Sequence, residues 1–308
     1  MLTKLYPMVQ FKKDTWEIDE FDCASMFLLI GTERALLIDC GMGIGDLRGA
    51  VEMLTDKPVT VALSHGHVDH TGNARQFPEA WLNPADRGAN IPESLEWRRG
   101  DVEHIAHRQK DCIGAPYTMF HLYPFDIDVD LREPVEPMPV VRDLLDGTQF
   151  DLGGGRVVTA YACPGHTAGE MVFLDPQTRT LIAGDAVNYN LGIGMTPVET
   201  TLKALKRIRD MSDQYDGIYN GHHDFRALGA PLDDDCLPAV IDMCEHLVAG
   251  DYYAPCEVPS FWGQSVPLSR REDAGSGNIF AKFGHRVLIH QGRNYLSFNP
   301  DSIKEQPK

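Results

Sequence analysis

Short runs of apolar, often β-branched residues recur along the chain, and longer segments between them carry apolar residues at helical spacing. The short runs are typical of buried strands, and the longer segments are typical of helices with one buried face. Their alternation predicts an α/β protein. Strands are expected at 26–30 and 35–39 as a hairpin, at 59–64, 157–161, 180–185 and 217–220, and elsewhere between 140 and 182; helices are expected at 46–55, 69–77, 93–110, 197–211 and 237–248.

Residues 84–138 interrupt this alternation and are expected to form an insertion. After the helix predicted at 93–110, five prolines between positions 116 and 139 indicate an irregular stretch. Aromatic side chains in this stretch either line an apolar pocket or anchor the insertion to the body, and the pattern leaves both interpretations open. They are Tyr117, Phe120, Tyr123 and Phe125.

The pattern weakens after residue 250. A strand pair is expected at 278–283 and 286–291, followed by a polar tail. Residues 1–249 are therefore expected to form one domain, and 250–308 a C-terminal extension that packs on the same domain.

The run from His65 to His70 places four metal-ligating side chains within six positions: His65, His67, Asp69 and His70. It follows a run that reads as a buried strand, and the chain after it can begin a helix, so the four side chains lie on a strand-to-helix loop. Imidazole and carboxylate groups are the ligands that zinc and similar divalent metals prefer. One tetrahedral ion could hardly use all four without strain, so the geometry favours two metals over one. The alternative is a merely polar, solvated loop, which this spacing after a buried strand disfavours.

Three further candidates also come directly after expected strands. His166 follows Pro164 and Gly165, which fix a tight turn, and Asp185 ends the strand before it. His222 follows Gly221, with His223 as a rival for the same role. Because each follows a strand, all could gather along one edge of the sheets.

These motifs, together with Asp39 in the run 36–41, resemble the metallo-β-lactamase superfamily of metal-dependent hydrolases over residues 26–223. The resemblance implies a four-layer αββα sandwich, with 1–249 as the catalytic domain and the metals at one edge. It implies that Asp39 orients the metal-binding loop. It implies one metal held by His65, His67 and His166, a second held by Asp69, His70 and His222, and Asp185 as the bridge between them.

The chemistry implied is hydrolysis. Two divalent ions, zinc by default with iron or manganese also suited to these atoms, lower the pKa of a shared water toward neutrality. Asp69 could transfer protons as well as bind metal. The second ring nitrogens of the histidines need acceptors, for which Asp39 or backbone carbonyls are suited.

The residue at position 185 narrows the substrate class. True zinc β-lactamases have Cys or Ser where this chain has Asp185, so β-lactamase activity is not expected. We expect a dinuclear metal-dependent hydrolase that cleaves a carboxylic ester, thioester or lactone by metal-bound hydroxide attack. The alternatives are a phosphodiesterase or nuclease with the same site, or a mononuclear iron enzyme of the oxygenase or persulfide type. Asn188 and Tyr189 could donate to a lactone carbonyl, although Tyr189 is one position out of register.

Composition limits the partners. The net charge of −17 argues against nucleic acid and anionic membrane surfaces, because phosphate binding needs clustered Lys and Arg. Residues 101–151 alone hold 11 acidic against 4 basic residues, which favours a neutral or cationic small-molecule substrate if this stretch overhangs the site. The seven scattered cysteines show no disulfide framework, and the N-terminus has no signal-peptide pattern, so we expect a cytoplasmic protein. Homo-oligomerisation is left open.

Overall fold

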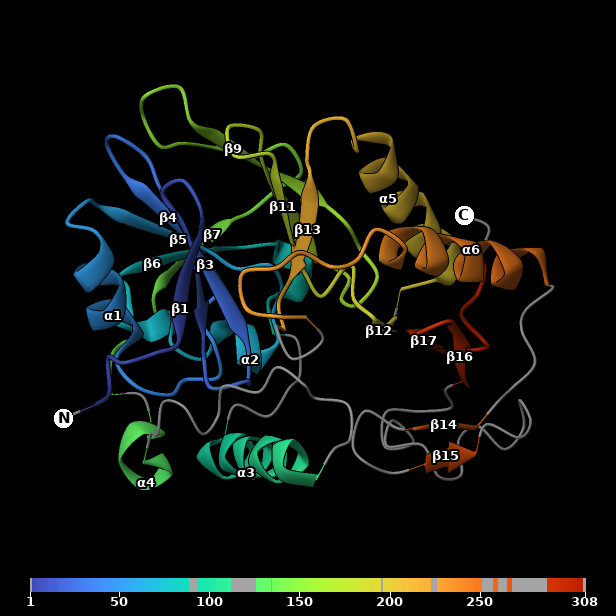
Figure 1. Ribbon diagram of the computed structural model, residues 1–308, viewed down its shortest axis with the longest axis horizontal. Helices are drawn as coiled ribbons and strands as arrows, with labels where there is room; N and C mark the ends of the chain where they lie inside the picture. The colour runs from blue at the N-terminus through green and yellow to red at the C-terminus, as the bar shows by residue number, and fades with distance from the viewer. Residues whose placement is uncertain are drawn as a thin grey trace.

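The structure is a computed structural model that describes residues 2–88, 94–111, 126–133, 135–194, 196–222, 226–250, 257–259, 265–267 and 287–306. Its body consists of two β-sheets with helices on their outer sides (Figure 1). Among the described residues, no helix combines the length and the hydrophobicity that a bilayer crossing requires.

The N-terminal half forms a seven-stranded sheet in which the strands lie in chain order. Pairing is antiparallel as far as β4 and parallel from β4 to β7. The hairpin expected at 26–30 and 35–39 is confirmed, whereas the first, second and sixth strands had not been predicted. The strands are β1 (Met8–Lys12), β2 (Thr15–Asp19), β3 (Ser25–Ile30), β4 (Ala35–Ile38), β5 (Val59–Ala62), β6 (Glu79–Leu82) and β7 (Val140–Asp143).

The second half forms a five-stranded sheet of order β13-β11-β10-β9-β8. Its strands pair antiparallel except for β11 and β13, which are parallel because the chain crosses over between them through a helix. The strands are β8 (Gln149–Asp151), β9 (Val157–Ala162), β10 (Met171–Asp175), β11 (Thr180–Gly184) and β13 (Gly217–Asn220).

Three hydrophobic clusters define the layers. One lies between the sheets and joins residues such as Phe27 of β3 with Phe173 of β10. A second covers the outer face of the first sheet with α1 (Leu47–Leu54), and a third covers the outer face of the second sheet with α5 (Val198–Asp210) and α6 (Cys236–Ala249). The four-layer αββα sandwich is therefore confirmed (Figure 1).

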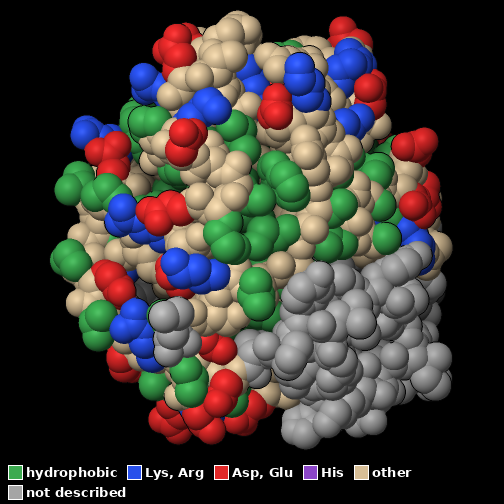
Figure 2. All heavy atoms as spheres, turned by 60° about the vertical axis from the view of Figure 1, so that its left-hand side comes forward, with side chains coloured by type: hydrophobic (Ala, Val, Ile, Leu, Met, Phe, Trp, Pro, Cys, Tyr) green, Lys and Arg blue, Asp and Glu red, His purple; other side chains and the backbone are tan. Residues whose placement is uncertain are grey.

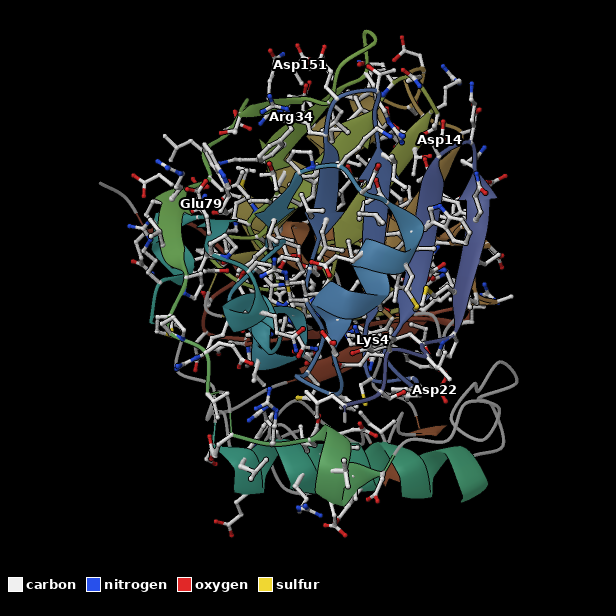
Figure 3. The ribbon with its side chains drawn as sticks, turned by 90° about the vertical axis from the view of Figure 1, so that its left-hand side faces the viewer. Lys4, Asp14, Asp22, Arg34, Glu79 and Asp151 are labelled. Carbon is white, nitrogen blue, oxygen red and sulfur yellow. The ribbon has the colours of Figure 1, made fainter. Side chains whose placement is uncertain are left out.

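The described part of the 84–138 insertion contains three helical segments. It comprises a single turn η2 (Pro84–Asp86), then α3 (Leu95–Asp111) and the short α4 (Ile127–Asp130). Both helices lie beyond one end of the sheets, and the labelled Arg34 and Asp151 lie at the opposite end (Figure 3). The four aromatic residues discussed above, Tyr117, Phe120, Tyr123 and Phe125, lie outside the described residues.

The helix predicted at 69–77 is wrong in its length. The chain forms only α2 (Val68–Thr71) and a separate turn η1 (Ala74–Gln76). Tertiary hydrogen bonds explain the break, since the N–H groups of Gly72 and Asn73 donate to the carbonyls of Gly41 and Cys40 at 2.7 and 3.1 Å instead of continuing the helix. Gly72 also packs directly on the backbone of Met42, where a Cβ would lie 2.1 Å from its carbonyl carbon.

The C-terminal extension contains more strand than expected. The strand expected at 286–291 is confirmed as β16 (Val287–Gln291), while 278–283 lies outside the described residues. The prediction of a polar tail after residue 291 is wrong. Residues 294–298 form the strand β17 (Asn294–Phe298), which pairs with β16 on one side and with β12 (Asn190–Gly192) on the other. A two-stranded pair, β14 (Glu257–Pro259) and β15 (Ser265–Pro267), is also described. Leu296 and Phe298 of β17 belong to the same hydrophobic cluster as α5 and α6.

Candidate metal centre

The candidate ligands belong to loops that follow strands of both sheets, and α2, which carries two of them, lies on the side of the body that faces α3 (Figure 1). Two backbone hydrogen bonds bring their loops together. The N–H of Met171 donates to Ser64 O at 2.8 Å, which joins β10 to the loop that begins at His65. The N–H of Gly221 donates to Gly184 O at 2.8 Å, so the residues that follow, Asp185 and His222, lie side by side.

The first cluster contains His65, His67 and His166, each with one nitrogen within 4.8 Å of the others. Two of these atoms, His166 Nε2 and His67 Nδ1, are only 2.9 Å apart. His65 is fully buried and the other two are partly exposed, so this group lies at the floor of an open site.

The second cluster contains Asp69, His70 and His222. Asp69 Oδ2 lies 3.5 Å from His70 Nε2 and 3.6 Å from His222 Nε2. His222 lies in this cluster, while His223, its rival for the same role, lies outside the described residues.

Asp185 lies between the two clusters. Its carboxylate is 3.6 Å from His166 Nε2 in the first cluster, and 3.3 Å from His222 Nε2 and 3.9 Å from His70 Nε2 in the second. The structure therefore brings all seven predicted side chains together, with Asp185 in the position that a bridging carboxylate would need.

Three of the histidines that line the centre, His65, His70 and His166, are held by their other ring nitrogen, as expected for metal ligands. Both expected kinds of acceptor occur, a carboxylate and a backbone carbonyl, together with a hydroxyl. His70 Nδ1 contacts Asp39 Oδ2 at 3.0 Å, His166 Nδ1 contacts Gly192 O at 2.9 Å, and His65 Nδ1 contacts Ser64 Oγ at 2.9 Å. Ser64 in turn donates its hydroxyl to Asp39 at 2.8 Å, so Asp39 orients the loop as the family resemblance implied.

Three buried atoms that face the centre have no hydrogen-bond partner within the described part of the chain: His65 Nε2, His70 Nε2 and Asp185 Oδ1. An unpaired buried polar atom is costly, about 1–3 kcal/mol each, and folded proteins rarely keep it without a reason. Two lone pairs and a carboxylate oxygen that converge on one space form a suitable donor set for divalent cations. The residues present therefore fit the metals that the fold implies.

The electrostatic environment divides the histidines into two kinds. Burial, reinforced by the neighbouring His166, lowers the pKa of His67 to about 3, so its imidazole is neutral at neutral pH. Burial also opposes a charge on His222, but the carboxylate of Asp185 outweighs it and raises the pKa of His222 to about 9. Although its burial acts in the opposite direction, the pKa of Asp185 is held well below its usual range by His222. Asp185 is therefore ionised, as a carboxylate ligand has to be.

Two buried acids behind the ligands were not predicted from the sequence. Asp86, at the end of η2, accepts the N–H of Gly66 at 3.0 Å, the N–H of Gly169 at 2.7 Å and the hydroxyl of Thr167 at 2.6 Å. Glu170 accepts the N–H of Asp185 at 3.0 Å and lies 3.5 Å from His65 Nδ1. Glu170 could have been noticed because it follows the His166 turn closely, whereas no spacing pattern identifies Asp86.

Tyr189 does not face the centre. Its hydroxyl accepts the N–H of Asp233 at 2.7 Å and contacts the guanidinium of Arg293, which also stacks on its ring. It is buried in the hydrophobic cluster that includes α5 and α6. The hydroxyl that could have assisted a lactone carbonyl is therefore committed to the C-terminal part of the fold.

With the fold and this centre established, comparison with known proteins identifies the family. The sequence model of the metallo-beta-lactamase superfamily matches residues 19–226, which is more than half of the chain. The chain belongs to this superfamily, and the resemblance inferred from its motifs is confirmed.

Relatives of known name share about a quarter of their aligned residues with the chain. The acyl-coenzyme A thioesterase MBLAC2 of Bos taurus is 25% identical over 181 residues, which cover 53% of this chain and 58% of the relative. The Gallus gallus protein of that name is 26% identical over 225 residues, or 67% and 74% of the two chains. The atrochrysone carboxyl ACP thioesterase of Aspergillus fumigatus is 26% identical over 200 residues, or 62% and 48%. The chain thus matches little more than half the length of the first of these relatives.

Solved structures share the fold at lower identity. A metallo-beta-lactamase from Pontibacter korlensis superposes with a TM-score of 0.51 at 16% identity, covering 77% of this chain and 98% of that one. The sec-alkylsulfatase Pisa1 from Pseudomonas sp. gives a TM-score of 0.53 at 14% identity, covering 80% and 42%. These likenesses establish the fold alone.

Proposed function

We propose that this chain is a dinuclear metal-dependent hydrolase that cleaves thioesters. The observation that carries the proposal is the pair of clusters with Asp185 between them, in which buried atoms without a hydrogen-bond partner among the described residues converge on one space. One metal would be held by His65, His67 and His166, the other by Asp69, His70 and His222, with Asp185 between them. Zinc suits this mixture of nitrogen and oxygen donors best.

Bound divalent cations would supply a water of lowered pKa and polarise the substrate carbonyl. The chain itself supplies rigidity, since Asp39, Ser64 and the carbonyl of Gly192 fix the ring orientation of three ligands. Asp69 would carry protons, because its carboxylate is a quarter exposed and so can reach solvent and the leaving group.

Several features favour a thioester over the other substrates. Three of the relatives described above are named thioesterases, and the Tyr189 hydroxyl that a lactone could have used is engaged elsewhere. A nuclease needs a continuous basic surface, yet on the face drawn in Figure 2 blue Lys and Arg side chains are interspersed with red Asp and Glu. The second cluster argues against a mononuclear iron enzyme, because such an enzyme has no need for Asp69, His70 and His222 around a second point.

A paired rate assay on metal-analysed protein tests the proposal. The decanoyl thioester of a small uncharged thiol, an activated carboxylic ester and an activated phosphodiester are compared before and after chelation, and again after zinc is restored. We expect the thioester to be preferred and its turnover to disappear on chelation. Turnover that persists in metal-free protein, or a preference for the phosphodiester, would overturn the proposal.

Variants separate the centre from general effects of mutation. His67→Ala and Asp185→Ala should each lose bound metal and activity together. His246→Ala is the matched control, because this histidine lies on the exposed side of α6 beside Asp242 and should leave both unchanged.

A further inference from the structure

A cavity of about 400 Å³ lies behind the metal-binding loop, on its far side from the metal centre. Gly66, Val68 and Thr71 line it, whereas none of the seven candidate ligands does. The loop thus has two faces, one toward the metals and one toward this cavity. The volume falls within the range of ~300–1,000 Å³ that is typical of small-molecule sites.

Most of the cavity wall is apolar. Leu82 and Ala80 of β6, Val141 of β7 and Val68 of α2 contribute to it. The apolar surface continues outward from the cavity, since Met138 lines it and yet is 62% exposed, and the nearby Val140 is also 62% exposed. A chain-like apolar ligand could therefore enter here and be covered along much of its length.

The polar part of the wall is cationic in character. Arg75 lines the cavity and donates one N–H to the carbonyl of Glu136 at 3.3 Å, and no carboxylate pairs with its guanidinium among the residues that the structure describes. Arg87 and Arg98 also line it, the first paired with Asp143 outside the cavity lining.

The two acids of the wall are already engaged. The Asp86 oxygens accept hydrogen bonds from both metal-binding loops, and Glu133 Oε1 accepts the N–H of Leu95 at 3.3 Å. An unpaired guanidinium at the wall of an apolar cavity, in a chain of net charge −17, is complementary to a ligand with an apolar body and an anionic head.

We infer that this cavity binds a medium-chain fatty carboxylate, with the carboxylate on Arg75 and the acyl chain against Leu82, Ala80 and Val141. The site stands on the cavity and its charge, and does not depend on the proposed thioesterase activity. It lies against Asp86 and Gly66, which support the metal-binding loop. An occupant would therefore contact the same backbone that positions His65 and His67.

Titration calorimetry of the protein with decanoate, kept below its micelle concentration, tests the inference. We expect saturable binding of one decanoate per chain. Arg75→Met should weaken it by about tenfold or more, as expected when a charge-assisted hydrogen bond is lost, while Arg75→Lys should retain much of it. Val141→Phe should abolish binding by filling the cavity. Decanol, with the same chain and no charge, should bind weakly and equally to the parent and to Arg75→Met.

Arg142→Met is the matched control, because Arg142 lies on the same strand as Val141 but pairs with the partly exposed Glu79, which is not among the residues that line the cavity. It should bind decanoate like the parent. Binding that is unchanged in both Arg75→Met and Val141→Phe would place the carboxylate elsewhere, such as on the metals, and would overturn the inference. Absence of saturable binding to the parent protein would overturn it as well.

Discussion

The hydroxyl of Thr167 donates a hydrogen bond to Asp86 at 2.6 Å, and this contact joins the two loops that carry the first metal cluster. Asp86 Oδ2 also accepts the N–H of Gly66, in the loop of His65 and His67, while its Oδ1 accepts the N–H of Gly169, in the loop of His166. One buried carboxylate from a third segment therefore fixes the distance between ligands that come from different sheets.

Asp86→Asn tests this relationship. An amide offers one acceptor oxygen where the carboxylate offers two, so its NH₂ group must face an N–H or O–H donor of one loop. We expect one of the two metal equivalents to bind about 10–100-fold more weakly while the other is little changed, as is typical when the outer partners of a metal site are removed.

Competition with a chromophoric chelator measures the two affinities of this variant. Asp216→Asn, which alters an exposed pair with Arg179, is the control and should behave like the parent. An equal loss at both metals, or no loss, would show that Asp86 does not act on the first cluster in particular.

Removal of the metals should destabilise the fold. Without cations, His65 Nε2, His70 Nε2 and Asp185 Oδ1 remain buried without a hydrogen-bond partner among the described residues. Binding to the native state adds roughly 4 kcal/mol of stability when free metal is about 1,000-fold above its Kd. For a chain of this size we expect the Tm to rise by several degrees when zinc is returned to chelated protein.

Differential scanning calorimetry checks this prediction, with Asp185→Ala as the comparison. The variant should lose most of the zinc-dependent rise, because it lacks the carboxylate between the clusters. A Tm that does not depend on zinc in the parent protein would argue against a metal centre at these residues.

The fold could be predicted in those segments whose stabilising contacts are made between residues close together in the sequence. Helix α1 begins at the Asp46 cap, whose carboxylate accepts the N–H of Gly49, and both features are visible in the local pattern. Helix α2 ends early because Gly72 and Asn73 bind the segment 40–41, which no local pattern reveals. Strand β17 was missed for the same reason, since one of its two pairing partners is β12, about a hundred residues earlier.

The candidate site divides in the same way. The seven candidate ligands could be predicted because their residue types are chemically specific and they occur in short motifs that come after apolar strands. Asp86 could not, because it acts through contacts with the backbone of Gly66 and Gly169 and resembles any surface acid in sequence. The contribution of Gly192 is a carbonyl oxygen, which every residue has, so only the tertiary structure could identify it.

Glu20 gives a prediction of pH dependence. Its buried carboxyl accepts the N–H groups of Met42, Gly43 and Ile44, which shapes the loop after β4. Burial raises its pKa from 4.5 to about 8, although those N–H groups act in the opposite direction. A group whose pKa is raised on folding stabilises the protein fully below its unfolded pKa and loses that contribution as the pH rises through the folded pKa.

Glu20→Gln removes this titration. The stability advantage of the parent over the variant should therefore be largest near about pH 5 and shrink by an amount on the order of a few kcal/mol toward about pH 8.5. Urea unfolding of both proteins across this range measures the difference directly. An advantage that grows with pH would show that the N–H groups stabilise the charged form more than burial opposes it.

Arg226 joins the two sheets beside the second metal cluster. Its guanidinium makes a two-pronged ion pair with the buried Glu17 of β2, at 2.7 and 3.0 Å. It also donates to the side-chain and backbone oxygens of Asn220, at 2.8 and 2.9 Å, and Asn220 lies two residues before His222. Its position therefore affects both the stability of the body and the placement of His222.

Arg226→Met should cost about 3–5 kcal/mol of unfolding free energy, because it leaves Glu17 buried without its partner. Arg226→Lys should recover only part of this, since a single ammonium group cannot reproduce the two-pronged geometry. Arg179→Met is the control, because its pair with Asp216 is exposed and should be worth at most about 1 kcal/mol. Chemical denaturation of chelated protein gives these values without a contribution from metal.

Zinc titration of the folded variants should then show weaker binding at the cluster of His222 for Arg226→Lys and parent-like binding for Arg179→Met. Parent-like stability and zinc binding in both Arg226 variants would mean that the ion pair does not position this loop.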